Sequence, residues 1–194
     1  MTVAPHLVTV AILTLLAAVG QSQPPKGQMP DLGRHTQQDD KVPLFDFAAY
    51  FVGAWTFEWD VPEGPLGPAG RIEGRTVYSA VGENVFQALT EATGPAGKFT
   101  IKELINYQRE QKTLSREVVD SRGFTYKQSG KIGGDLGGLF TIYYVSEPFL
   151  ANGEQVRLNH TMRLTAPLAY RVSTTVAVGD HLKNYGTPWW RKAE

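Results

Sequence analysis

The stretch WTFEWDV, residues 55–61, alternates large apolar side chains with polar ones at a period of two. In an extended chain, successive side chains point to opposite faces. The tryptophans, the phenylalanine and the valine therefore share one face, and the threonine and the two carboxylates share the other. The same alternation recurs at 99–107 and 140–144. The sequence predicts a series of half-buried β-strands.

Turn signals rich in Gly, Pro, Asn and Ser separate these segments. They fall at 64–70, 81–84, 94–97, 121–123, 152–154 and 166–168. Many strands of about ten residues joined by such turns are typical of an antiparallel barrel or sandwich. Leu44 to Val52 (LFDFAAYFV) is the one segment that favours a helix. Because it is too short to be stable alone, we expect it to lie across one end of a barrel.

The apolar pattern of the last predicted hairpin provides a check on its register. A three-residue loop, Ala166-Pro167-Leu168, places Leu164 opposite Tyr170. The pairs that follow are Met162/Val172, His160/Thr174, Leu158/Val176 and Val156/Val178. Almost every apolar side chain then lies on one face, whereas a slip of one residue scatters them between faces.

The N-terminus resembles a secretory signal. Leu7 to Val19 is apolar but short for a membrane span, and Ala18 and Gly20 stand where signal peptidase sites carry small residues. We predict a signal peptide over residues 1–20. An uncleaved anchor helix is the alternative, because Met1 to His6 contains no Lys or Arg. No later run is apolar enough to cross a bilayer, so the mature protein is expected to be secreted or periplasmic.

Residues 21–43 are rich in Pro, Gln, Gly and charge, which predicts a disordered leader before a folded domain at 44–194. The chain has no cysteine, and this excludes disulfides and thiolate chemistry. Its 19 basic and 19 acidic residues give a formal net charge of zero, so no nucleic-acid partner is expected. No catalytic motif is present, and the four histidines are too dispersed to predict a metal site.

Gly53-Ala54-Trp55 forms a G-x-W triplet at the head of the strand series. It resembles the start of lipocalins and their calycin relatives, and residues 44–192 resemble a bacterial family of uncharacterised lipocalin-like proteins. The resemblance implies an up-and-down antiparallel barrel of eight to ten strands with a short N-terminal helix. It also implies that a late basic residue, Arg191, packs over Trp55. The related nitrobindin-like haem barrels carry more glycines after the tryptophan, so no haem or other cofactor is expected.

Three polar residues interrupt the predicted inward faces: Glu103, Arg116 and His160. A tight turn near 110–111 makes the first two strands antiparallel and places Glu103 diagonally near Arg116. The two residues form either a buried pair that fixes register or, with His160, the polar end of a cavity. In the second case they hold the carboxylate or hydroxyl of an apolar small molecule. For His160 alone, a hydrogen-bonded wall residue is the other interpretation.

The function these patterns favour is binding of a small apolar or amphipathic ligand outside the cytoplasm. Trp59, Tyr107 and Tyr144 are the candidate apolar wall, and Glu103, Arg116 and His160 the groups that orient the ligand. Two alternatives stay open. One is a ligand-free structural or interaction module whose barrel is filled by its own side chains. The other is an enzyme with Glu103 and His160 as an acid–base pair.

Overall fold

The structure, a computed structural model, describes residues 44–134 and 138–193. The predicted signal peptide and leader lie outside the described residues. In the described part the chain forms one short helix and twelve strands. Their bounds are α1 Phe47–Phe51, β1 Gly53–Val61, β2 Gly70–Gly82, β3 Val85–Gly94, β4 Gly97–Gln108, β5 Thr113–Asp120, β6 Phe124–Gly134, β7 Phe140–Ser146, β8 Phe149–Ala151, β9 Glu154–Ala166, β10 Ala169–Val178, β11 His181–Asn184 and β12 Trp189–Lys192.

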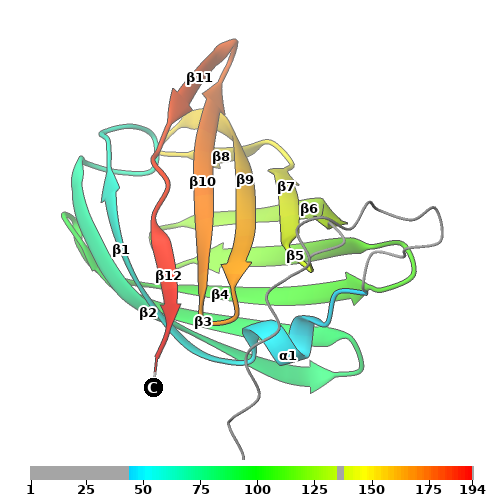
Figure 1. Ribbon diagram of the computed structural model, residues 1–194. Coiled ribbons are helices and arrows are strands. Elements are labelled where there is room, and N and C mark those ends of the chain that lie inside the picture. The colour runs from blue at the N-terminus through cyan, green and yellow to red at the C-terminus, as the bar shows by residue number, and fades with distance from the viewer. Residues whose placement is uncertain (1–43, 135–137, 194) are drawn as a thin grey trace, which may run out of the picture. The chain divides into compact units, whose positions relative to one another are not determined.

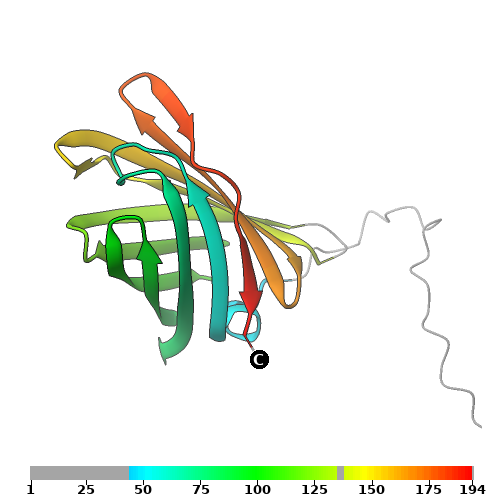
Figure 2. The same cartoon turned by 90° about the vertical axis from the view of Figure 1, so that its left-hand side faces the viewer.

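Ten of these strands close into an antiparallel barrel. Their order is β10-β12-β1-β2-β3-β4-β5-β6-β7-β9, and β9 pairs with β10 to complete the ring. Closure removes the free sheet edges that invite aggregation. Figure 1 shows β12, the last strand, between β1 and β10. The short strands β8 and β11 add to the rim, and Figure 2 shows the β10–β11 hairpin rising past the other strands. The all-β barrel with a short N-terminal helix is therefore confirmed.

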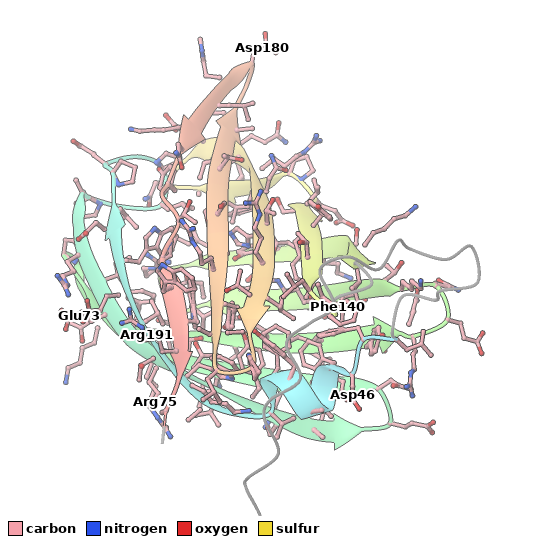
Figure 3. All side chains as sticks on the ribbon, in the orientation of Figure 1. Asp46, Glu73, Arg75, Phe140, Asp180 and Arg191 are labelled. Carbon is pink, nitrogen blue, oxygen red and sulfur yellow. The ribbon has the colours of Figure 1, made fainter. Side chains whose placement is uncertain are left out.

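Helix α1 closes one end of the barrel. Asp46 caps it by accepting a hydrogen bond from the Ala49 backbone N–H at 3.0 Å. Phe47 and Phe51 are buried, and with Phe45 they pack into a cluster of inward side chains from most of the strands. Five residues form a helix too short to persist in water, so these aromatic contacts hold it in place. Figure 3 labels Asp46 beside α1 and Asp180 at the tip of the β10–β11 hairpin, at the other end of the molecule.

The predicted register of the last hairpin is confirmed residue by residue. Leu164 pairs with Tyr170, and the four predicted pairs that follow are all present. Glu103 and Arg116 lie on adjacent antiparallel strands, with Ile105 directly opposite Arg116. The inward parity of these strands was therefore correctly inferred from the apolar pattern.

The predicted partner of Trp55 is wrong by one residue. Lys192, directly opposite Trp55 in the β1–β12 pairing, places its Nζ 5.4 Å from the ring centroid. Arg191 is opposite Thr56 and is exposed. Successive residues of a strand face opposite sides, so only the even-numbered residues of β12 point toward the tryptophan. The glycine of the triplet, Gly53, has φ +122°, a conformation that favours glycine, and a Cβ there would meet the Lys192 side chain at 3.3 Å.

The helix plug yields a stability prediction. We expect Phe51→Ala to lower the free energy of unfolding by about 3–5 kcal/mol, because it leaves a cavity in a closed aromatic cluster. Val52→Ala, one residue on and partly exposed, is the matched control and should change it by less than about 0.5 kcal/mol. Urea denaturation measures both. Equal losses would contradict a plug that stabilises the barrel.

Candidate functional site

A polar layer crosses the barrel at mid-height. It consists of Glu103 on β4, Arg116 on β5, Gln128 on β6 and His160 on β9. On β9, the inward neighbours of His160 belong to different apolar clusters: Met162 to the cluster that includes α1, and Leu158 to the cluster at the far end. The layer therefore separates a half filled by side chains and α1 from the other half of the barrel.

The guanidinium of Arg116 joins the layer together. It donates to Glu103 Oε2 at 2.7 Å, to Gln128 Oε1 from Nε at 2.8 Å and from Nη2 at 2.5 Å, and to His160 Nδ1 at 2.7 Å. Its Cζ lies 4.3 Å from the centroid of the Tyr144 ring. The Arg116 and Glu103 side chains are only 9% and 11% exposed. Four other strands thus contribute groups that compensate one buried positive charge.

The contact with Arg116 determines which nitrogen of His160 carries the proton. A guanidinium only donates hydrogen bonds, so Nδ1 must accept and the ring proton must sit on Nε2. Burial, and then the positive charge of Arg116, lower the pKa of His160 to about 3. His160 is therefore neutral at physiological pH and presents a fixed N–H donor. Among the described residues, nothing accepts a hydrogen bond from this nitrogen.

Arg116 keeps its charge. Burial by itself would lower its pKa, but Glu103 and the surrounding tyrosines outweigh burial and raise it. Burial raises the pKa of Tyr78, Tyr126 and Tyr144, so these phenols stay protonated. The layer as a whole holds one positive and one negative charge, from Arg116 and Glu103.

A cavity of about 120 Å³ borders the polar layer. Its lining comes mainly from the two apolar clusters away from α1, and Tyr78, Met162, Tyr170 and Val172 of the α1 cluster also line it. Glu103, Arg116 and His160 form the polar part of its wall, and Tyr126 lines it beside them. The remaining wall is mostly apolar and includes Phe57, Trp59, Leu66, Ile72, Phe99, Ile101, Phe124, Leu158 and Trp190. The hydroxyls of Thr76 and Thr90 also border it, 2.8 Å from each other.

A second cavity of about 260 Å³ adjoins the first at the end of the barrel opposite α1. The two share Trp59, Leu66, Ile72, Phe99, Arg122 and Phe124 in their linings. Arg122 stands at this junction, with its Cζ 4.0 Å from the centroid of the Phe99 ring. It pairs with Asp120 at 2.6 Å and donates to the Leu66 carbonyl at 3.4 Å. Arg122 therefore links the β5–β6 turn to the β1–β2 loop across the mouth.

The structure brings four of the six candidate site residues together around the inner cavity: Trp59, Glu103, Arg116 and His160. Tyr144 lies under the Arg116 guanidinium and is buried, outside the cavity lining. Tyr107 is in the filled half, where its hydroxyl donates to the Phe45 carbonyl at 2.8 Å. Its strand parity is inward as predicted, but its position along the strand places it against the helix segment.

Sequence reasoning missed Gln128, Asp120 and Arg122. Gln128 shares its strand face with Phe124 and Tyr126, and Asp120 shares its face with Arg116, so parity alone could have found both. Arg122 lies in a turn, where no periodicity applies. No group of three or more His, Cys, Asp or Glu side chains within residues 44–134 and 138–193 is placed to hold a metal ion.

Comparisons with known proteins support the fold. The structure is similar to the crystal structure of Rv2717c from M. tuberculosis, with a TM-score of 0.62 and 14% sequence identity over 74% of this chain and 93% of that one. No family model matches the sequence, and no curated protein matches it. No helix of the described residues has the length and apolarity needed to span a membrane. The class these findings define is a ten-stranded antiparallel barrel.

The buried ion pair yields a second prediction. We expect Arg116→Met to lower the free energy of unfolding by about 3–5 kcal/mol, because it leaves the Glu103 carboxylate buried without a partner. Arg71→Met is the control, since Arg71 and its partner Glu58 are both exposed, and it should cost less than about 1 kcal/mol. Chemical denaturation at neutral pH measures both. Similar values for the two variants would show that Arg116 is solvated.

The neutral state of His160 predicts a pH dependence. Its pKa is lower in the folded protein than the value of about 6.5 expected in the unfolded chain. The unfolded state therefore binds the proton more readily, and the stability that neutral His160 contributes is present above pH 6.5 and lost as the pH falls. The loss approaches about 1.4 kcal/mol per pH unit between pH 6 and 4.5.

His160→Asn removes the titrating group and keeps an oxygen that can accept from Arg116. The difference in unfolding free energy between the unmodified protein and His160→Asn should shrink as the pH falls from 7 to 4.5, because only the unmodified protein loses the contribution of neutral His160. The other acidic and basic groups titrate in both proteins and cancel in the comparison. Urea denaturation at several pH values measures it. A constant difference would contradict a buried neutral histidine.

Proposed function

We propose that this protein is an exported, lipocalin-like barrel that binds a small, largely apolar ligand in the half of the barrel away from α1. The observation that carries the proposal is the inner cavity that borders the polar layer. Its wall is mainly apolar, and a few polar groups converge on one side of it, the combination typical of small-molecule sites. Export rests on the apolar N-terminal stretch, and the lipocalin-like relationship rests on the G-x-W triplet and the barrel.

The space suits a small ligand. Binding pockets for drug-sized molecules measure about 300–1,000 Å³. The inner cavity of about 120 Å³ is smaller than this, but the adjoining outer cavity of about 260 Å³ extends it to the end of the barrel. A ligand would enter past the 62–69 loop and Arg122, because α1 and its aromatic cluster fill the other end.

The alternative is a ligand-free module, and the filled half of the barrel supports it. Seventeen buried residues, from Phe45 to Val172, form the cluster around α1. This alternative predicts that the remaining half is also closed to ligands in solution. The acid–base enzyme gains no support, because His160 Nδ1 accepts from Arg116 and the proton on Nε2 leaves no nitrogen free to act as a base.

Uptake of N-phenyl-1-naphthylamine, a neutral lipophilic fluorophore, tests the proposal. We expect its emission to rise, and the emission of the wall tryptophans to fall by energy transfer, when it binds the mature protein. Ile101→Trp fills the inner cavity and should weaken binding at least about tenfold, since the probe loses most of its apolar contact area. Lys102→Trp, on the outer face of the same strand, is the control and should bind as the unmodified protein does.

Circular dichroism verifies that both variants keep the barrel. Absence of uptake by the folded, unmodified protein would favour the ligand-free module. Equal uptake by the two tryptophan variants would place the probe outside the barrel and contradict the proposal in the same way.

A further inference from the structure

The charged groups around the inner cavity are paired with one another. Glu103 pairs with Arg116 at 2.7 Å, and Asp120 pairs with Arg122 at 2.6 Å. Gln128 Oε1 accepts two further hydrogen bonds from Arg116. A ligand with a charged head group would have to break one of these pairs or bury its charge without a partner, and both cost free energy. The wall therefore disfavours carboxylates and amines alike.

The hydrogen-bonding direction of His160 is also fixed. Its Nδ1 is held by Arg116 Nη2 at 2.7 Å, so its Nε2 can only donate. The side chain is on the inward face of β9, borders the cavity and is partly exposed there. Its neighbours on the same strand face, Leu158 and Met162, are apolar and buried. A single oriented N–H thus stands on an apolar strand face.

We infer that the cavity selects an uncharged, largely apolar molecule whose carbonyl or similar acceptor takes the hydrogen bond that His160 Nε2 has to give. This inference rests on the proposed binding function and narrows the carboxylate or hydroxyl expected from the sequence to an uncharged acceptor. A ligand that covers this donor without accepting from it leaves the donor buried and unpaired, which costs free energy. A ligand with an acceptor at this point therefore gains over one of the same shape without it.

The shape of the space indicates how such a molecule lies. Cavities of about 150 Å³ hold a benzene-sized molecule, so the inner cavity of about 120 Å³ accepts the acceptor group and little more. The remaining apolar part extends between Trp59, Phe99 and Phe124 toward the outer cavity. The guanidinium of Arg122, already stacked on Phe99, covers it on one side.

Three naphthalenes of similar shape test this preference: 2-acetylnaphthalene, 2-isopropylnaphthalene and 2-naphthoate. The first carries a neutral acceptor, the second no polar group and the third an anionic carboxylate. We expect the ketone to bind about fivefold more tightly than the hydrocarbon, the ratio for one hydrogen bond of about 1 kcal/mol. The carboxylate should bind at least about tenfold more weakly than the ketone, because its charge finds no free counter-charge. Competition with N-phenyl-1-naphthylamine on the mature protein measures all three.

His160→Asn is the matched variant. Its shorter amide keeps an acceptor for Arg116 but places no group where Nε2 stands. It should lose the preference for the ketone, so that the ratio of the ketone and hydrocarbon affinities falls from about five to about one. The ¹⁵N shifts of histidine side chains give a readout independent of binding: the signals absent from the variant should be those of a neutral ring protonated on Nε2 between pH 5 and 8.

The outcomes distinguish failure of the selectivity from failure of the binding function on which it rests. Binding of the hydrocarbon and the ketone with equal affinity, or tightest binding of the carboxylate, would overturn the selectivity and leave the binding function in place. A proton on Nδ1 in the NMR spectrum would overturn it too. Failure of all the naphthalenes and of the fluorophore to bind the folded protein would overturn the binding function, and the selectivity with it.

Discussion

The positive charge of Arg116 lies inside a closed barrel, where water cannot compensate it freely. Partners must therefore come from the surrounding strands: a carboxylate from β4, an amide oxygen from β6, an aromatic face from β7 and an imidazole nitrogen from β9. A one-residue slip of any of these strands would turn its partner to the outer face. The requirement to compensate one charge thus fixes the register of half the barrel, in addition to the apolar pattern.

The same layer divides the interior. On one side, α1 and inward side chains fill the barrel. On the other side, two smaller apolar clusters pack the walls and leave two adjoining cavities. A barrel of ten strands is wide enough that side chains alone do not fill it everywhere. The short helix supplies the missing volume at one end only. The asymmetry between a filled half and an open half therefore follows from where the chain places α1.

Local patterns in the sequence predicted much of this architecture. Strand parity, the register of the β9–β10 hairpin and the Glu103–Arg116 contact all follow from alternation and short turns, which involve neighbouring segments of the chain. The errors and omissions involve contacts between distant segments. The resemblance implied a late basic partner for Trp55 but could not distinguish Arg191 from Lys192. Strand β12 follows an irregular segment, so its parity cannot be counted from the preceding strand. Tyr107 faces inward as predicted, but its height in the barrel depends on how β4 is staggered against α1.

The polar layer links a structural requirement to the selectivity proposed for the cavity. Arg116 needs an acceptor from β9, and His160 supplies it through Nδ1. That contact leaves the imidazole without a free lone pair and keeps it neutral, because a protonated ring would face the guanidinium with a like charge. The nitrogen on the cavity side is then a donor at every physiological pH. The contact that stabilises the strands thereby makes an N–H donor the one hydrogen-bonding group that His160 can offer a ligand. To offer an acceptor instead, the imidazole would first have to break its contact with Arg116.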